Sequence, residues 1–311
     1  MIIHDGCENL NLIAPVVTLG IFDGVHRGHR TLLSSLVSRA KEAKGESVVI
    51  TFSPHPRLVL QKDHAGLLFL TTMKEKQILL DNEGIDHLIV LDFNKEFSKM
   101  HACDFVKQIL VNKIGTKHLL VGYNHHFGTR GEGDFNTIVQ CAESFDFKVE
   151  QVQGFHTEEG VISSSIIRKA LSEGRLDAAN AMLGYHYSLS GEVVSGKQIG
   201  RSLGFPTANI NPDDKHKLIP SNGVYAVVVK MKGEEYPGML SIGTNPTVNA
   251  DPLKRSIEVN ILNFEKDIYG DSITVVFRKW LREEKKFNNI EELTKQMETD
   301  KQDTIRLLSH K

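Results

Sequence analysis

The sequence predicts a parallel, doubly wound α/β sheet in its first half and an antiparallel β domain, a small barrel, in its second half. Apolar segments and helical segments alternate up to Gly184, as they do where helices join parallel strands. From Tyr185 onward, short alternating segments separated by turn residues replace the long helices. The length of 311 residues fits two domains, which we expect at 1–184 and 185–311.

The first predicted strand leads into a segment rich in Gly and His. Residues 15–19 form a short, β-branched run, which is typical of a buried strand. Helical spacing begins after His29 and continues to Lys44. The turn at 20–29 therefore lies at the carboxyl end of a strand, where open α/β sheets bind their ligands.

The remaining elements follow from the same periodicities. In the first half we expect strands at 47–52, 87–91, 118–121 and 148–152, and helices at 73–82, 102–112, 135–145 and 176–183. In the second half we expect strands at 188–194, 223–230, 238–242, 257–262 and 273–278, followed by a helix at 290–309.

The residue types of the turn suit nucleotide phosphates. Gly20, Gly24 and Gly28 allow the backbone to approach a ligand closely, and the first amides of the following helix favour an anion. His26 and His29 add two side-chain donors on one helical turn. The segment is neither a Walker loop nor a GxGxxG turn, and it lacks both the HExxH spacing and an elbow nucleophile.

Other polar segments are expected at the same edge of the sheet. The loop at 53–57 contains His55, and the Gly-rich loop at 122–133 contains Asn124. Three serines, Ser163, Ser164 and Ser165, precede a helix that carries Arg168. Taken alone, the serines predict an ordinary capped helix. Beside the turn, serine hydroxyls, helix amides and Arg168 are suited to a departing pyrophosphate.

The second half has its own polar motif, in which a basic, Gly-rich segment at 196–204 runs into Thr207 and Asn209. These two residues share one face of an extended chain and offer oxygen ligands that suit Mg²⁺ beside phosphates. Glu258 lies within a predicted strand. It is either a solvated strand residue or, if it faces a pocket, a general base.

Composition limits the function classes. A net charge of −2 gives no basic footprint for nucleic acid. Cys7, Cys103 and Cys141 are odd in number and lack metal-site spacing, so we expect reduced thiols in a cytoplasmic protein. No apolar run reaches membrane-spanning length, and we expect no membrane partner.

The motifs resemble a known family. The segment His26-Arg27-Gly28-His29 is the HxGH of the Rossmann-like nucleotidyltransferases, and its longer form resembles the FAD synthetase module of the bifunctional bacterial riboflavin kinase/FMN adenylyltransferases. The ISSSxIR motif at 162–168 fits that module. The second half resembles the riboflavin kinase domain, a six-stranded barrel, on the PTAN motif at 206–209, the NGVY motif at 222–225, Glu258 and the segment 281–287. In the loop at 122–133, Tyr-Asn-His-His stands where the family commonly has an acidic residue and Phe-Arg.

The resemblance implies two ATP-dependent steps: phosphorylation of riboflavin to FMN, and adenylylation of FMN to FAD with release of pyrophosphate. It implies Mg²⁺ as cofactor, riboflavin, FMN, FAD and ATP as partners, and a monomer or weak homo-oligomer. The residues implied as catalytic are Glu258, His26, His29 and Arg168. Those implied for ATP and phosphate are Gly20, Phe22, Asp23, Gly24, Gly28, Asn124, Ser163, Ser164, Ser165, Gly196, Lys197, Gly200, Arg201, Pro206 and Thr207. Those implied for the flavin are His55, Asn222, Tyr225, Arg282 and Glu284, and those for the metal are Thr207 and Asn209.

Two alternatives stay open at this point. The α/β domain could adenylylate another acceptor, as related cytidylyl and pantetheine-phosphate transferases do, although the FDGxHxGH form and the fused kinase argue against this. The β domain could instead be a flavin-binding or sensing module without catalysis, which the joint presence of Thr207, Asn209 and Glu258 disfavours.

Overall fold

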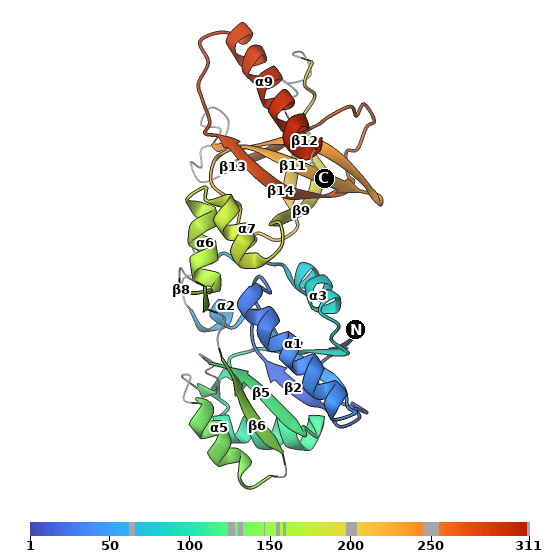
Figure 1. The fold of residues 1–311 in the computed structure, drawn as a ribbon, viewed down its shortest axis with the longest axis vertical. Helices are drawn as coiled ribbons and strands as arrows, with labels where there is room; N and C mark the ends of the chain where they lie inside the picture. The colour runs from blue at the N-terminus through green and yellow to red at the C-terminus, as the bar shows by residue number, and fades with distance from the viewer. Residues whose placement is uncertain are drawn as a thin grey trace. The chain divides into compact units, whose positions relative to one another are not determined.

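A computed structural model describes residues 1–61, 66–123, 128–129, 133–145, 147–153, 156–157, 160–196, 204–244 and 255–309. The chain divides into two compact units, Met1–Ser164 and Ser165–Lys311. The first unit contains a parallel sheet with helices, and the second contains a closed barrel (Figure 1). The predicted fold class is therefore confirmed.

The sheet of the first unit is six-stranded, with the order β1-β4-β3-β2-β5-β6 and parallel pairing throughout. Its strands are β1 (Ile2–Asp5), β2 (Val16–Leu19), β3 (Ser47–Ser53), β4 (His87–Asp92), β5 (His118–Gly122) and β6 (Lys148–Val152). From β2 the chain winds through β3 to β4 in one direction, and β5 then returns to the other side of β2. The winding thus reverses between β2 and β5, which makes their carboxyl ends the expected ligand site.

Helices cover both faces of this sheet. They are α1 (Arg27–Glu42), α2 (Pro56–Leu60), α3 (Met73–Asn82), α4 (Ala102–Phe105) and α5 (Phe135–Ala142), with the 3₁₀ segment η1 (Phe97–Lys99) and the π-helical segment η2 (Val106–Ile114). A short hairpin of β7 (His156–Thr157) and β8 (Gly160–Val161) precedes the unit boundary. The helix expected at 102–112 is thus α-helical only in its first turn.

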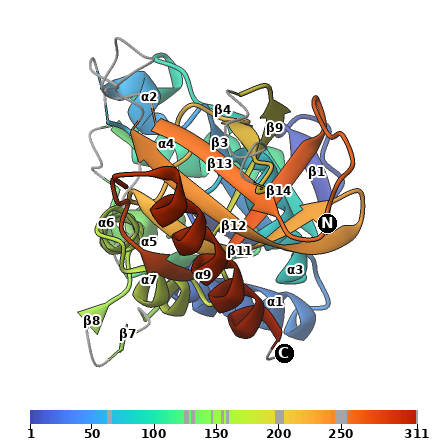
Figure 2. The same ribbon diagram turned by 90° about the horizontal axis from the view of Figure 1, so that it is seen from above.

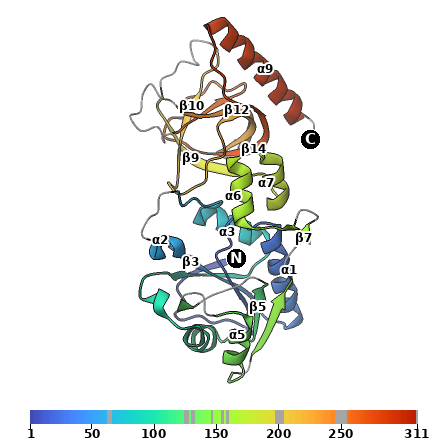
Figure 3. The same ribbon diagram turned by 90° about the vertical axis from the view of Figure 1, so that its left-hand side faces the viewer.

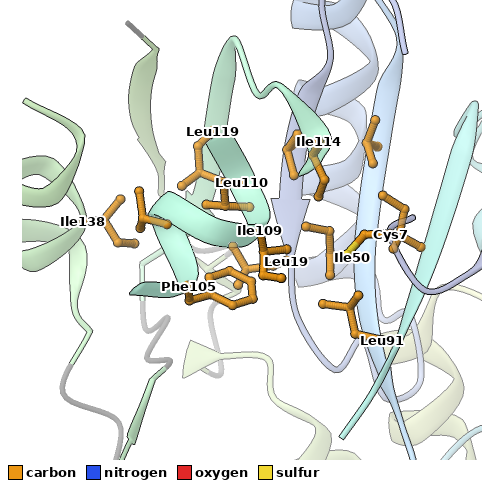
Figure 4. Close-up of a cluster of buried hydrophobic side chains, with 14 of the residues drawn as sticks. Cys7, Leu19, Ile50, Leu91, Phe105, Ile109, Leu110, Ile114, Leu119 and Ile138 are labelled. Atoms are coloured by element: carbon orange, nitrogen blue, oxygen red, sulfur yellow. The ribbon is translucent and has the colours of Figure 1, made fainter. Parts of the chain in front are cut away.

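The core shows why the strands are apolar on both sides. Val17 and Leu19 of β2 pack with Ile109 and Ile138 on one face, in the cluster drawn in Figure 4. The neighbouring Val16 packs with a different cluster, formed largely by the buried side of α1. Because adjacent strand residues point to opposite faces, a strand covered on both faces must be a continuous apolar run.

The expectation of three reduced thiols is wrong for two of the cysteines. Cys103 in α4 and Cys141 in α5 form a disulfide, with their Cα atoms 5.3 Å apart. The two helices pack against each other, and this packing brings together residues that are 38 positions apart in the chain. Cys7 is buried and free, and burial raises the pKa of its thiol.

The second unit is built around a closed, antiparallel barrel with the order β10-β13-β12-β11-β14-β9. Its strands are β9 (Ser188–Val194), β10 (Ala208–Pro212), β11 (Gly223–Met231), β12 (Glu234–Thr244), β13 (Arg255–Ile261) and β14 (Ser272–Arg282). Several of them are seen around the ring in Figure 3, with the C-terminal helix outside it. The six-stranded barrel is confirmed.

Three helices complete this unit: α6 (Ser164–Ser172), α7 (Leu176–Leu183) and α9 (Ile290–Ser309). The helix α9 lies against β11, β12 and β14, and Figure 2 shows it running across the barrel. Gly184, with a φ of 78°, ends α7 in the left-handed conformation that favours glycine.

Candidate active sites

The first candidate site is the turn after β2, at the point where the winding of the sheet reverses. Phe22 and Val25 have positive φ angles of 50° and 34°, and Gly24 has a φ of 84°. The segment from Phe22 to His26 is buried. Positive φ in buried non-Gly residues is strained backbone, which is often found at functional sites. The packing therefore holds the turn in one conformation, with the start of α1 directly behind it.

Asp23 holds the turn together. Its carboxylate accepts hydrogen bonds from the backbone amides of Leu70 (2.9 Å) and Thr71 (3.1 Å), and it is only 5% exposed. Thr71 in turn accepts a hydrogen bond from the amide of Gly24 at 3.1 Å. The backbone carbonyl of Asp23 accepts a hydrogen bond from the hydroxyl of Ser164 at 2.9 Å. Asp23, which was expected at the phosphate, thus holds residues 70 and 71 by its carboxylate and Ser164 by its backbone carbonyl.

His26 and His29 form a stacked pair at the start of α1. Their ring centroids are 3.7 Å apart, and Nδ1 of His26 accepts the N-cap hydrogen bond from the amide of His29. A Cβ atom on Gly28 would lie 3.2 Å from the His26 ring, so this position favours glycine. Phe22 packs edge-on against His29. The ring of Phe22 also lies 3.1 Å from the position that a Cβ atom on Gly20 would take.

Both imidazoles are neutral at neutral pH. Burial lowers the pKa of His26 to about 4. Burial, His26 and Lys76 together hold the pKa of His29 well below its usual range. With Nδ1 of His26 accepting a hydrogen bond, its proton is on Nε2. The pair therefore offers hydrogen-bond donors rather than positive charge.

The serine segment reaches the same turn at its first residues. Ile162 is buried, with its carbonyl oxygen 3.7 Å from where a Cβ atom on Gly28 would be, and Ser164 bonds to Asp23. Arg168 donates to the hydroxyl of Ser165 at 3.2 Å, one turn further along α6 and beyond the unit boundary. Ser163 is half-buried at the start of this segment.

His55 lies at the carboxyl end of β3, the strand next to β2. Its Nδ1 caps α2 by accepting from the amide of Arg57 at 3.1 Å, and its ring stacks on Phe69 at 4.3 Å. Asn124 lies outside the described residues. Gly122 ends β5, so the chain enters the loop at 122–133 beside the turn after β2.

The second candidate site is a cavity of about 300 Å³ between the barrel and α9. Its polar lining residues are Thr207, Ser241, Glu258, Asn260, Arg282, Glu284, Lys285 and Asp300, and its apolar lining residues are Val224, Met239, Phe287, Leu293 and Met297. An apolar cavity with a few convergent polar groups is typical of a small-molecule site. The structure thus brings four of the sequence-predicted residues to one cavity.

The predicted base, Glu258, and one predicted metal ligand, Thr207, line this cavity, and Asn209 lies opposite Glu258 on the neighbouring strand. The hydroxyl of Thr207 is 3.3 Å from Oε2 of Glu258, and Asn209 pairs with Glu258 across β10 and β13. A Cβ atom on Gly196 would displace the side-chain amide of Asn209 from its present position. Lys197, Gly200 and Arg201 lie outside the described residues.

These donors fit a divalent metal ion that is shared with nucleotide phosphates. They are the hydroxyl of Thr207 and the side-chain amide oxygen of Asn209, and such hard oxygen ligands suit ions of this kind. Among the described residues, no cluster of three or more His, Cys, Asp or Glu side chains could hold a metal.

The predicted flavin residues divide into two groups. Arg282 and Glu284 line the cavity, and Asn222 donates to Glu284 at 3.3 Å. Tyr225 is fully buried in the barrel, where its hydroxyl donates to the carbonyl of Ser221 and its ring packs edge-on against Phe277. The structure therefore places Tyr225 in the core and not on the cavity wall.

Three polar residues at these sites were missed by sequence reasoning. Asp300 in α9 is 5% exposed and pairs with Arg282, with an N–O distance of 2.6 Å. Asn260 in β13 donates to the carbonyl of Pro206 at 2.7 Å and so fixes the PTAN segment. Lys76 in α3 is 6% exposed and lies near Asp23 and His29. Each is a single polar residue in a helix or strand whose sequence pattern is ordinary. Only its buried position in the structure distinguishes it from a solvated surface residue.

Comparisons with known proteins match both halves of the chain. The FAD synthetase family model matches residues 10–166, and the riboflavin kinase family model matches residues 183–308. The chain is 38% identical to the bifunctional riboflavin kinase/FMN adenylyltransferase of Listeria monocytogenes, over 94% of this chain and 92% of that protein. It is also 38% identical to the protein of the same description from Escherichia coli, over 92% and 90%.

A solved structure from Streptococcus pneumoniae, described as a macrolide-efflux protein, matches with a TM-score of 0.88 and 30% identity over 97% of this chain and 98% of that one. In the part of the chain that the structure describes, no helix is long and apolar enough to cross a membrane. Both family models and the relatives of high coverage agree on two flavin-directed activities. The chain therefore belongs to the bifunctional riboflavin kinase/FMN adenylyltransferase family and makes FMN from riboflavin and FAD from FMN.

Proposed function

We propose that the turn after β2 carries the adenylyl transfer, with His26 and His29 donating hydrogen bonds to the α-phosphate of ATP. The FMN phosphate oxygen attacks this phosphorus, and the bond to the bridging oxygen breaks, so that its electron pair leaves with pyrophosphate. The stacked, neutral imidazoles at the helix start support this assignment, because donors fixed before the reaction stabilise developing charge. Arg168, Ser164 and Ser165 bind the pyrophosphate.

In this proposal the other residues of the turn shape the site. Gly20, Gly24 and Gly28 admit the phosphates, and Phe22 orients His29 by edge-on packing. Asp23 acts through the backbone that it holds and not by contact with ATP, because its carboxylate already accepts two amide hydrogen bonds. The role of Asn124 in nucleotide binding stays a prediction.

We further propose that Glu258 accepts the proton of the riboflavin 5′-hydroxyl as that oxygen attacks the γ-phosphate of a second ATP. Its position on the cavity wall beside Thr207 supports this role. Thr207 and Asn209 would hold Mg²⁺ together with the ATP phosphates, and the screening of phosphate charge by Lys197 and Arg201 stays a prediction. Arg282 and Glu284 border the flavin.

We propose 1–184 and 185–311 as the functional domains. The first family model ends at residue 166 and the second begins at residue 183, so most of α6 and α7 lies between them. The contact boundary after Ser164 assigns these two helices to the kinase unit. The helix α6 carries Ser164, Ser165 and Arg168 of the predicted transferase motif.

Reciprocal losses test the two assignments in one protein. We expect Glu258→Gln to reduce FMN formation from riboflavin by about 10²-fold or more and to leave conversion of supplied FMN to FAD unchanged. We expect His29→Ala to do the reverse, with a loss of about 10²-fold. Chromatographic separation of the flavins measures both steps. Glu192→Gln, on the exposed side of β9, is the matched control for Glu258→Gln. Loss of both activities in either variant would contradict the assignment of separate sites.

A further inference from the structure

Lys76 is a buried cation whose role the two reactions do not yet explain. It lies in the first turn of α3 and is 6% exposed. In the described part of the chain, its ammonium has no hydrogen bond and no ion pair within 4.0 Å. Buried lysines are normally paired, because an uncompensated ammonium loses its hydration.

The surrounding structure keeps Lys76 in this position. Asp23 binds the amides of residues 70 and 71, immediately before the helix. Thr72 then caps α3 in a capping box with Glu75. At the other end, Glu83 pairs with Arg30 of α1 at 2.5 Å. The first turn of α3, which carries Lys76, is thus fixed to the turn after β2.

The electrostatic surroundings of Lys76 favour the binding of an anion. Burial lowers the pKa of Lys76 to about 8, and Asp23 opposes this shift only in part. Lys76 also contributes to the lowered pKa of His29. In the described residues, Nδ1 of His29 is buried without a hydrogen-bond partner, which is a second polar group that lacks its complement. The helix amides of α1 add further positive potential at the same place.

We propose that the ammonium of Lys76 binds a phosphate oxygen of ATP beside His29 during adenylyl transfer. This inference rests on the proposed role of the turn after β2. Negative charge grows on the departing pyrophosphate as the bond between the α-phosphorus and the bridging oxygen breaks. A fixed, poorly hydrated cation at that position stabilises this charge more strongly than a surface lysine does. Lys76 is then a substrate-contacting residue supplied by α3.

The competing explanation is structural: Lys76 would only balance the charge of Asp23. The two explanations make opposite predictions for Lys76→Met, which keeps the length of the side chain and removes its charge. If Lys76 balances Asp23, the substitution lowers stability. If the partner of Lys76 is a substrate anion, the ammonium is uncompensated in the ligand-free protein. The substitution then removes this charge and leaves the ligand-free protein equally or more stable.

The test uses full-length Lys76→Met with Lys74→Met as the matched control, because Lys74 is exposed on the same helix turn. Steady-state assays measure kcat/KM for ATP in FMN adenylylation, and riboflavin phosphorylation in the same samples reports on the intact kinase. A thermal melt reports on folding. We expect a loss of about 10²-fold in adenylylation, unchanged phosphorylation and an equal or higher melting temperature. Lys74→Met should match the parent in all three measurements.

Normal adenylylation in Lys76→Met, or a loss accompanied by a lower melting temperature, would overturn the inference. His29→Ala in the same series separates this outcome from failure of the proposed function. If His29→Ala loses FAD synthesis and Lys76→Met does not, only the role of Lys76 is wrong. If His29→Ala retains FAD synthesis, the turn after β2 is not the phosphate site.

Discussion

At the scale of single residues, different side chains of the proposed transferase site supply hydrogen bonds and positive charge. His26 and His29 are kept neutral by burial, so they donate hydrogen bonds without repelling the nearby ammonium of Lys76. Lys76 adds a cationic side chain beside them, and the nearby Asp23 opposes in part the lowering of its pKa by burial. Neutral hydrogen-bond donors and a cation therefore lie near one another without repulsion between positive charges.

The pKa of Lys76 gives a prediction for the pH dependence of adenylylation. The pKa in the free protein is about 8, set by burial against the opposing effect of Asp23. Because only the protonated amine binds phosphate, we expect kcat/KM for ATP to fall as pH rises through about 8. The neighbouring His26 and His29 are already neutral there and do not contribute. Lys76→Met should lack this alkaline fall, and a profile shared by both proteins would contradict the assignment.

At the scale of elements, sequence periodicity was sufficient for most helices and strands. The predicted limits of β9 and α9 match the structure, because each has a strong period between clear turn residues. The strands β1 and β10 were not predicted. None of the four residues of β1 is buried, and β10 has one buried residue, Ile210, and ends in Pro212. Their pairing comes from the sheet and barrel they complete, and not from their own pattern.

The candidate sites were predictable to a similar degree. Motifs indicated the turn after β2 and the group of Thr207, Asn209 and Glu258, since their residue types are unusual in their segments. Lys76 and Asp300 could not be predicted, because a charged residue in a polar helix is normally solvated. Tyr225 is the opposite case: it belongs to a motif of the resembling family, but its side chain packs in the barrel core.

The pair of Asp300 and Arg282 joins α9 to the cavity wall and gives the prediction at this scale. Arg282 donates to both carboxylate oxygens, and the two side chains are 15% and 5% exposed. Asp300→Asn leaves the guanidinium without its partner, so we expect a loss of about 3 kcal/mol in stability and a raised KM for riboflavin. Adenylylation of FMN should be unchanged.

The control is Asp303→Asn in the same helix, where the pair with Arg306 is largely exposed. Such surface pairs contribute about 1 kcal/mol or less. Urea unfolding, together with riboflavin saturation curves, measures both effects. Equal effects of the two substitutions would show that Asp300 does not hold the cavity wall.

At the scale of the whole molecule, α6 and α7 belong to the kinase unit by their contacts. The amide of Ser221 donates to the carbonyl of Leu171 at 3.0 Å. Asn180 accepts from the amide of Tyr187 at 2.8 Å and donates to the carbonyl of Phe277 at 3.3 Å. Ile167, Ala170 and Ala179 are fully buried. The two helices thus cover the part of the barrel near its first strand.

Two fragments test this division. Residues 165–311 and 185–311 both contain every residue that lines the cavity, so we expect both to convert riboflavin to FMN and neither to make FAD. The longer fragment should melt at least about 5 °C higher, because the shorter one loses several buried apolar side chains and hydrogen bonds. Calorimetry measures the difference. Equal melting temperatures would mean that α6 and α7 do not stabilise the kinase unit.

The closure of the barrel determines how the second unit unfolds locally. Every barrel strand has a hydrogen-bonded neighbour on both sides, so no strand can fray from an edge. The parallel sheet instead has terminal strands, β1 and β6, with one neighbour each. In amide hydrogen exchange, the central amides of β11 and β14 should therefore exchange together, through opening of the whole ring. The amides of β1 should exchange first, by local opening that leaves the transferase turn in place.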